Sequence, residues 1–594
     1  MQVHVLRNRI AFLGIVFALA AAPTALRASN AYIVRNLVSD IPDLADFTDP
    51  NLKGAWGIAE SGKSPFWISD ASTGLSTLYS SSGSVIPLVV TIPPAKGGTA
   101  GIPTGVVYNG TTGFTVATGD PASFIFATLD GTISGWNGTA NKAASIVMVD
   151  NSSKGAVYTG LAMATAGTVT YIYAANLSAG TIDVFNSTFT PVALPNAFQD
   201  PNIPTGYAPF NIQNLGGNLY VTYALQNSGK NFASPGAGNG YVDVYSPAGT
   251  LMQHLISTGK LNAPWGVAIA PANFGDFAND LLVGNFGDGL INVYNPTTGA
   301  AVATLNDVYG APITVPNLWA LQVGNGGSGG DANAVYFTSG IPGPDNGQHG
   351  LLGRVQAGPV LTVANVQNGA SFLTNIAPNT FVTMTGANLS GTTRSFASED
   401  IVGNVLPTDI DSVSVTVNGT RAFVSYVSPT QINFLMPVST APGPVTLQSY
   451  NFGCASNAVT VQVDAVAPAF FTQSDGKHIL AFHANGTLVG PASTTTGATP
   501  AAPGETIVCY GTGFGPTNPA APDGMVISAP LPLATAPTVT IGGASATVTY
   551  SDLTFAGVFQ INVTVPASAS SGDQPLVANA SSVSSPSTAV IAVQ

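Results

Sequence analysis

The chain has 594 residues and a formal net charge of −13, and 7% of its residues are charged while 45% are hydrophobic. With 15 lysines and arginines in all, the sequence excludes the basic patch that nucleic-acid binding needs and disfavours attraction to anionic lipid. The length exceeds one hydrophobic core, and short β-branched and aromatic runs between Gly, Pro, Asn and Asp predict several all-β domains.

Residues 1–28 have the pattern of a secretory signal peptide. A basic start is followed by an apolar run over residues 10–22, which is too short to span a bilayer, and cleavage is expected after Ala28. An uncleaved anchor is the alternative, because Leu26 departs from the small-residue pattern of a cleavage site. We expect a secreted, periplasmic or cell-surface protein with no membrane insertion once the signal is removed.

A repeat of about 50 residues occupies residues 30–357. Each copy begins with an apolar or aromatic residue. We call the position after it, which is usually glycine, the glycine slot, and an apolar strand follows. The slots hold Gly57, Gly105, Gly160, Asn211, Gly266 and Ala320. A second strand, a glycine-rich corner and a third strand follow in every copy, and a fourth strand is expected in five of the six. Repeats of this kind are typical of propeller blades, so we predict a six-bladed β-propeller.

The sixth copy lacks a fourth strand, because the chain leaves the repeat at Gln356. An unassigned strand, residues 31–38, precedes the first copy. We predict that it supplies the missing outer strand and closes the ring, which removes an exposed sheet edge.

A different pattern repeats in the last 240 or so residues. "PGETIVCYGTGFGP" matches "PNTFVTMTGANLSG", and "QINVTVP" matches "QINFLMP". Alternating strands with turn signals predict two immunoglobulin-like β-sandwich modules at 359–466 and 503–594. Residues 467–502 are expected to connect them and to contain a hairpin, whose Asn485-Gly486 pair suits a tight turn. The predicted fold class is therefore all-β, a six-bladed β-propeller followed by two immunoglobulin-like modules.

Several stretches resemble known families. "LNAPWGVAIAP", "LLVGNFGDG" and "GYAPFNIQNLGGNLYVTYA" resemble an uncharacterised family of exported bacterial propeller proteins, and the blades are similar to those of NHL and lactonase-type propellers. "PGETIVCYGTGFGPTNP" and the two QIN strands resemble the paired IPT/TIG-like module of proteins secreted by Acidobacteria-type bacteria. Neither resemblance implies an established activity. Propellers similar to the lactonase type include binding proteins and metal-dependent hydrolases.

The axial opening of the propeller is the expected ligand site, because loops from all blades meet there. Most of the candidate ligand-binding residues fall at or near the end of a second strand, and the full set is Asp70, Asn176, Tyr223, Asn285, Asp288 and His349. Converging carboxylate and amide oxygens could bind Ca²⁺. The alternative is that the Asn and Asp residues only form turns before glycine, so the metal remains undetermined.

Other residues have two interpretations each. The aromatic residues before the slots could stack on a sugar or pack the blades together: Trp56, Phe210, Trp265 and Trp319. Glu60 is expected in a loop, which departs from the axial glutamate of the lactonase-type pattern, and His254 is expected to be structural. Cys454 and Cys509 could form a disulfide or stay buried thiols.

No nucleophile elbow, zinc-protease motif, EF-hand loop or Walker A sequence is present in the chain. We therefore expect an exported, non-enzymatic binding or interaction protein whose axial propeller face recognises a ligand, with carbohydrate or an envelope component as candidates. The two modules would act as a spacer or contact the envelope or matrix. The alternatives are a metal-dependent, lactonase-like hydrolase or lyase and a purely structural surface protein.

Overall fold

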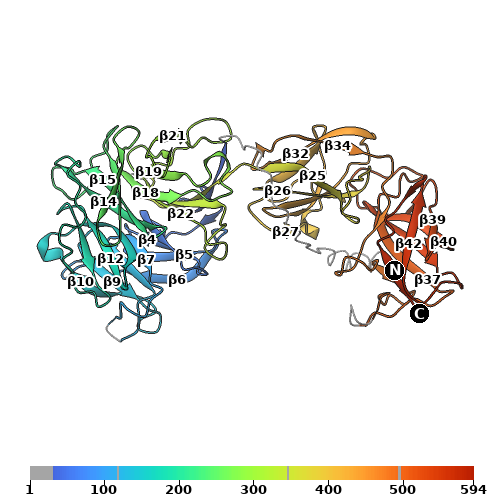
Figure 1. Ribbon diagram of the computed structural model, residues 1–594, viewed down its shortest axis with the longest axis horizontal. Helices are drawn as coiled ribbons and strands as arrows, with labels where there is room; N and C mark the ends of the chain where they lie inside the picture. The colour runs from blue at the N-terminus through green and yellow to red at the C-terminus, as the bar shows by residue number, and fades with distance from the viewer. Residues whose placement is uncertain (1–30, 117–118, 344–346, 492–496) are drawn as a thin grey trace. The chain divides into compact units, whose positions relative to one another are not determined.

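The computed structural model describes residues 31–116, 119–343, 347–491 and 497–594 (Figure 1). The expected signal peptide lies outside these residues. Residues 29–357 form one compact unit, and residues 358–594 belong to a second. The helical elements of the described residues are three short 3₁₀ turns, η1 (Ser152–Lys154), η2 (Gly275–Phe277) and η3 (Ser398–Asp400), and none of these is a membrane-spanning helix. The all-β fold class is confirmed.

The first unit is a six-bladed propeller, as the repeat predicts. The innermost strands are β3 (Ala55–Ala59), β7 (Pro103–Tyr108), β11 (Tyr158–Ala166), β14 (Tyr207–Leu215), β18 (Pro264–Ile269) and β22 (Leu318–Val323). The second strands are β4 (Phe66–Asp70), β8 (Phe124–Thr128), β12 (Val169–Asn176), β15 (Asn218–Leu225), β19 (Leu281–Asn285) and β23 (Ala334–Ser339). The third strands are β5 (Leu75–Tyr79), β9 (Thr132–Trp136), β13 (Thr181–Phe185), β16 (Tyr241–Tyr245), β20 (Ile291–Tyr294) and β24 (Leu351–Ala357). Consecutive innermost strands contact one another, and β22 returns to β3, so the ring is closed.

Outer strands complete four blades from within their own repeat: β6 (Val85–Thr91), β10 (Ile146–Asp150), β17 (Leu251–Ser257) and β21 (Ala301–Thr304). The third blade differs from the sequence expectation, because its described sheet contains three strands, β11, β12 and β13. The segment after β13 contains Pro191 and Pro195. Among the described residues the segment makes a single bridge, Phe185 opposite Pro191, with the Val192 N–H donating to the Val184 carbonyl, and proline, which has no backbone N–H, cannot extend it into a full ladder.

The predicted closure of the ring is confirmed by β1 (Tyr32–Ser39), which pairs antiparallel with β24. The register runs from Tyr32 opposite Ala357 to Ser39 opposite Leu351, and β2 (Phe47–Thr48) adds a short parallel strand beside β1. The Tyr32 side chain is fully buried, packs on Phe274 and donates a hydrogen bond of 2.9 Å to its carbonyl oxygen. The first described strand therefore joins the last blade to the fifth.

The glycine slot is explained by the crowding of backbones around the axis. A Cβ atom at four of the slots would lie 2.2 to 2.4 Å from an atom of the next innermost strand: Gly57 from Thr104 O, Gly105 from Leu161 N, Gly160 from Asn211 Oδ1 and Gly266 from Trp319 O. The fourth slot can hold Asn211 because its side chain fills the space left beside Gly160 and donates to the Trp265 carbonyl at 2.9 Å. Small residues at these positions let six strands converge.

The second unit contains two sandwich modules. The sheets of the first are β25 (Val360–Asn368), β26 (Phe381–Ala387), β31 (Gln431–Leu435), β30 (Phe423–Val427) and β27 (Arg394–Ser395), and β29 (Thr420–Arg421), β28 (Val413–Val417), β32 (Gly443–Asn451), β33 (Cys454–Ala455) and β34 (Val459–Val463). Their inward faces share one core that includes Val382, Met384, Val415 and Phe434.

The second module is built around one large sheet. It contains β35 (Ala469–Phe470), β36 (Ala481–Phe482), β37 (Thr506–Thr512), β38 (Leu531–Pro532), β39 (Thr538–Ile541), β40 (Ala544–Phe555), β41 (Val558–Thr564), β42 (Gly572–Ala580), β43 (Val583–Ser584) and β44 (Val590–Val593). The strands β35 and β36 lie in the segment expected to connect the modules, and both pair with β37. The expected hairpin turns at Asn485-Gly486, where the Gly486 N–H donates to the His483 carbonyl.

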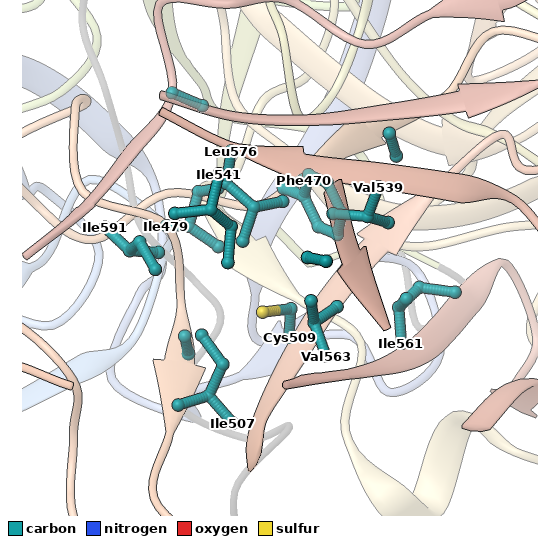
Figure 2. Packing of buried hydrophobic residues seen from close by; sticks show 14 of the residues in the cluster. Phe470, Ile479, Ile507, Cys509, Val539, Ile541, Ile561, Val563, Leu576 and Ile591 are labelled. Carbon is teal, nitrogen blue, oxygen red and sulfur yellow. The ribbon is translucent and has the colours of Figure 1, made fainter. Parts of the chain in front are cut away.

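The two cysteines are free and buried thiols. Cys509 lies in the core of the second module among Ile507, Val563 and neighbouring aliphatic side chains (Figure 2). Burial raises the pKa of its thiol to about 12, so the thiol stays protonated at neutral pH. Cys454 lies in the first module, on β33.

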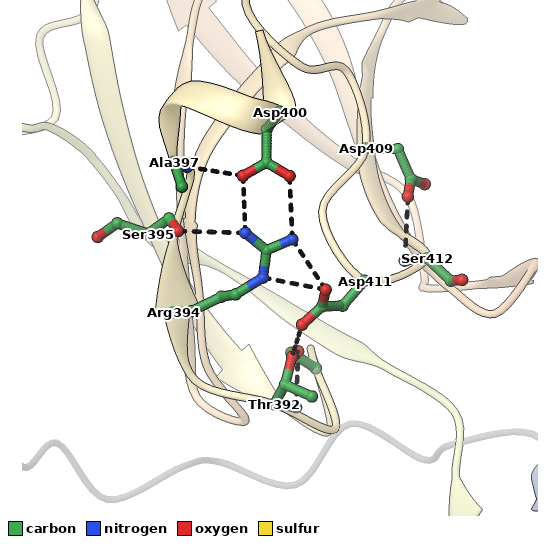
Figure 3. Close-up of polar contacts among 9 residues, drawn as sticks. Thr392, Arg394, Ser395, Ala397, Asp400, Asp409, Asp411 and Ser412 are labelled. Carbon is green, nitrogen blue, oxygen red and sulfur yellow. Dashed lines mark hydrogen bonds and ion pairs between the residues drawn. The ribbon is translucent and has the colours of Figure 1, made fainter. Parts of the chain in front are cut away.

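One arginine organises the polar edge of the first module. The Arg394 guanidinium donates to Asp400 at 2.7 and 3.2 Å and through Nε to Asp411 at 3.0 Å (Figure 3). The two carboxylates raise the pKa of Arg394 further, and the hydrogen bonds from the Arg394 guanidinium lower the pKa of Asp400. The planar guanidinium matches the two carboxylates geometrically, and thereby ties β27 to the loop that contains η3.

Closure of the ring is tested by deleting residues 31–38. The deletion exposes the unpaired edge of β24, and such edges pair with other chains. We expect soluble aggregates in size-exclusion chromatography and a lower melting temperature. Tyr32→Phe, which removes one hydrogen bond and keeps the strand, should remain monomeric. A deletion variant that is monomeric and melts with the parent would contradict the role of β1.

Crowding at the slot is tested by Gly105→Ala. The new Cβ would lie 2.4 Å from Leu161 N, and overpacking of this kind costs about 1–3 kcal/mol of unfolding free energy. The matched control is Gly62→Ala, where nothing lies within 4 Å of the new Cβ. Chemical unfolding followed by intrinsic fluorescence measures both. Equal unfolding midpoints for the two variants would contradict the close packing of backbones at the axis.

Candidate functional site

Asp70, the first candidate, lies inside the first blade. It ends β4 and is fully buried, and neither carboxylate oxygen accepts a hydrogen bond from the part of the chain that the structure describes. Burial, and then the nearby Asp49 carboxylate, raise the pKa of Asp70 well above its usual value. Asp49 in turn accepts a hydrogen bond of 2.9 Å from the Tyr79 hydroxyl. Asp70 is therefore a carboxyl group of the core whose surroundings favour its neutral form.

The amide candidates make local contacts. Asn176 donates to Asp183 in the neighbouring strand at 3.0 Å and accepts from the Val157 N–H at 3.3 Å. Asn285 donates to the Lys260 carbonyl at 2.8 Å and to Asp288 at 3.4 Å. Asn285 and Asp288 are thus the one pair of candidates that these hydrogen bonds bring together.

The last two candidates belong to other networks. The hydroxyl groups of Tyr223 and Tyr245 lie 2.9 Å apart within the fourth blade. His349 Nδ1 lies 2.7 Å from Asp40 Oδ2, and Lys53 lies 3.7 Å from the same carboxylate. The six candidates are therefore spread over five blades, only Asn285 and Asp288 contact each other, and the role of all six in ligand binding stays a prediction.

Aromatic side chains fill the axis at the end of the ring where these candidates lie. Ala55 pairs with Asp70 and Pro264 with Asn285, so the starts of the innermost strands share an end with the candidates. We call the six rings there the aromatic plug: Trp56, Phe210, Phe232, Trp265, Phe286 and Trp319. Trp319 stacks on Trp56 at 3.6 Å and on Phe286 at 4.4 Å between ring centroids. The four aromatics that precede the slots are at most 4% exposed, so they pack the ring together.

A cavity of about 260 Å³ occupies the axis on the other side of the slots. Its walls are the final residues of the innermost strands from several blades, and we call it the axial chamber. Its polar lining consists of Glu60, Asn211, Gln213, Asn214 and Gln322, and Tyr108 supplies an aromatic side. Gln213 Nε2 donates at 3.4 Å to the carbonyl of Leu321, which belongs to another blade. The lining reaches the surface at the exposed side chains of Tyr108 and Asn214.

Glu60 is the acidic group of the axial chamber. It follows the end of β3, as a loop residue should, but this loop lies at the axis and not at the periphery. Gln322 Nε2 lies 3.5 Å from Oε1, and Oε2 is buried without a hydrogen bond from any residue described. Burial raises the pKa of Glu60 from 4.5 to about 8. At pH 7 the group is mostly a neutral carboxylic acid that both donates and accepts.

Sequence reasoning missed the axial chamber, although a signal exists. Polar residues stand two or three positions after the slot in three repeats, as Glu60, Gln213 and Gln322. Those positions end an innermost strand, so a polar side chain there faces the axis or its mouth. The candidates predicted from the sequence lie instead near the ends of the second strands, at the opposite end of the ring.

Among the described residues, one group of three metal-ligating side chains comes together, Asp200, Asp243 and His254. Asp243 lies on β16 and His254 on β17, the third and outermost strands of the fourth blade. This group is at the rim of the propeller and not on its axis. At the axis, where Ca²⁺ binding was one of two interpretations, the described residues form no comparable group of metal-ligating side chains.

Comparison with known sequences places the chain in a family. It is 30% identical over 337 residues to the uncharacterized protein R648 of Acanthamoeba polyphaga mimivirus. The aligned region covers 55% of this chain and 81% of the viral protein. This chain belongs to the family of the mimivirus protein R648. A second mimivirus protein, L690, is 29% identical and is covered over 86% of its length. These relatives are viral, whereas the sequence resemblance implied a bacterial family.

Other comparisons concern the two units of this R648-family chain. Residues 371–474 match the IPT/TIG domain family, which supports the immunoglobulin-like assignment of the first module. A structure of a Bacteroides thetaiotaomicron protein of unknown function has a TM-score of 0.35 at 13% identity, over 55% of this chain and 76% of that one. A streptogramin B lyase has a TM-score of 0.34 at 11% identity, over 56% of this chain and all of that one.

The raised pKa of Glu60 predicts a pH dependence of stability. The folded state holds the proton more tightly than the unfolded state, so stability is full below pH 4.5 and falls as the pH rises through about 8. Glu60→Gln keeps the shape and cannot ionise. The melting temperature of Glu60→Gln should therefore rise relative to that of the parent as the pH increases from 5 to 8. Glu399→Gln, at an exposed position of the second unit, serves as control, and a constant difference between Glu60→Gln and the parent across this range would contradict the burial of Glu60.

Proposed function

We propose that this protein binds a carbohydrate, and that the axial chamber of the propeller holds one sugar unit of it. The observation that supports the proposal is the chamber itself, a cavity of about 260 Å³ lined by neutral polar groups. The aromatic plug fills the axis beyond it, so the ligand would enter past Tyr108 and Asn214. Concave sites with a few placed polar groups on an apolar wall are typical of small-ligand binding.

The chemistry of the lining suits hydroxyl groups. The amides of Gln213 and Gln322 each donate and accept hydrogen bonds, and so does the protonated carboxyl group of Glu60. Every sugar hydroxyl also donates and accepts, so each group can be satisfied without a charge. Among the described residues, no lysine or arginine lines the chamber, which disfavours phosphate. Tyr108, at the mouth, offers a ring on which a sugar face could pack.

This lining favours binding over metal-dependent hydrolysis. A catalytic zinc ion takes three protein ligands, and calcium takes six to eight oxygens. Glu60 is the one carboxyl group of the chamber lining, and its raised pKa makes it a poor metal ligand at pH 7. The lactonase-like alternative would need more carboxylates at this place.

The remaining parts of the proposal concern location and the second unit. The amino-terminal pattern supports export, and the mature chain would work outside the cytoplasm or at the cell surface. The two immunoglobulin-like modules would then carry the propeller as a spacer or contact an envelope or matrix component. Their low charge and independent cores are compatible with this role.

A glycan array probed with the mature chain tests the binding function. We expect a defined set of sugars to bind and the variant Glu60→Ala with Gln322→Ala to lose at least about tenfold in affinity, because two buried hydrogen-bonding groups are removed. Asp288→Ala, at the other end of the axis, is the matched control and should bind like the parent. Absence of glycan binding would refute the function. Loss of affinity in Asp288→Ala alone would show that the ligand binds at the end of the axis predicted from the sequence.

A further inference from the structure

Three metal-ligating side chains meet at the rim of the fourth blade. Asp243 and His254 come from adjacent strands, and Asp200 comes from the long connection between β13 and β14. One ligand atom of each residue lies within 4.8 Å of the other two. The group is remote from the axial chamber and has no part in the proposed carbohydrate binding.

Two carboxylates compete for one nitrogen in this group. Asp200 Oδ2 lies 2.6 Å and Asp243 Oδ1 2.8 Å from His254 Nδ1. A ring nitrogen carries at most one hydrogen, so it can donate to one of them. Asp243 makes the hydrogen bond, and Asp200 Oδ2 is buried and accepts none from the described chain. The single proton on His254 Nδ1 therefore leaves Asp200 Oδ2 without a hydrogen bond from the described residues.

The second atom of each carboxylate is held elsewhere. Asp200 Oδ1 accepts hydrogen bonds from the backbone N–H of Asn202 at 2.7 Å and from its side-chain amide at 2.8 Å. Asp243 Oδ2 accepts from the Tyr245 hydroxyl at 3.1 Å, and Tyr245 in turn contacts Tyr223 at 2.9 Å. Both carboxylates thus aim a single oxygen at the shared point. Supporting contacts of this kind orient metal ligands in proteins.

The imidazole is oriented in the same way. His254 Nε2 lies 2.7 Å from Ser257 Oγ, which leaves Nδ1 facing the carboxylates. The His254 side chain is 23% exposed, whereas both carboxylates are 0% exposed, so the group is open to solvent on the histidine side. No lysine or arginine among the described residues pairs with Asp200 or Asp243.

The ligand types select the ion. Two carboxylate oxygens and one imidazole nitrogen suit Zn²⁺ and its transition-metal neighbours, while Ca²⁺ takes six to eight oxygens and seldom uses nitrogen. Three protein ligands leave one tetrahedral position for water, which the exposed histidine side can admit. We propose that Asp200 Oδ2, Asp243 Oδ1 and His254 Nδ1 bind one Zn²⁺ ion.

The site would also have a mechanical effect. The connection that carries Asp200 follows the blade whose described sheet has no fourth strand. Zn²⁺ would tie this connection to the two outer strands of the next blade and so add an attachment that the connection otherwise makes through few backbone hydrogen bonds. Bound metal should therefore stabilise the propeller and slow proteolysis of residues 186–206.

Metal titration of the mature chain, after removal of metals with a chelator, tests this site. We expect one equivalent of Zn²⁺ by calorimetry, a higher melting temperature with Zn²⁺ than with Ca²⁺, and a visible spectrum of tetrahedral Co²⁺ on substitution. His254→Gln and Asp200→Asn should each weaken Zn²⁺ binding at least tenfold. Asp200→Asn changes a loop residue outside the strands, so it reports on binding even if His254→Gln unfolds.

His483→Gln is the matched control. His483 lies 2.5 Å from Glu505 in the second module, and its other ring nitrogen lies 3.0 Å from the Thr499 carbonyl, so it pairs with a carboxylate outside any group of three. It should bind Zn²⁺ like the parent. The proposal fails if the parent binds no stoichiometric Zn²⁺, if Ca²⁺ stabilises it more than Zn²⁺ does, or if Asp200→Asn binds Zn²⁺ like the parent.

Discussion

The close approach of six innermost strands at the axis governs the propeller. At four of the six slots no Cβ fits between one strand and the next, so backbone packs on backbone there. Two different spaces then arise on either side of this narrow ring. Large aromatic side chains before the slots meet and fill one of them, and shorter polar side chains after the slots leave the other hollow. The aromatic plug and the axial chamber are thus two results of one constraint.

The plug gives the chamber its chemical character. Six packed rings put apolar material at its closed end. On the other side of the slots, burial raises the pKa of Glu60 to about 8, so its carboxyl group is mostly neutral at pH 7. A neutral acid beside two amides favours uncharged, hydroxyl-rich ligands over ions. The rim group has the opposite character, because two buried carboxylates there share a single histidine nitrogen.

Much of the fold follows from the sequence, since its repeats are local patterns. The recurring slot gives the number of blades. The strand that begins at Tyr32 pairs with the sixth blade because the sixth repeat has no fourth strand of its own. The sites were harder to predict. Glu60 looks like any loop residue until the ring brings β3 and β22 together, and Asp200, Asp243 and His254 meet only because a connection folds over the next blade. A fourth strand was expected in the third blade despite the prolines of that connection, and nothing local signalled where Asp200 would lie.

Closure by β1 also has a consequence for the order of folding. Ser39 donates its hydroxyl hydrogen to the carbonyl of Gly350, a contact that spans 311 residues. Pairing over such a separation requires a large loop to close, and proteins dominated by distant contacts fold slowly. The chain is synthesised from its amino terminus, so β1 stays unpaired until the sixth blade has formed. The ring is therefore completed last, and until then the strand that later seals it is exposed to incorrect partners.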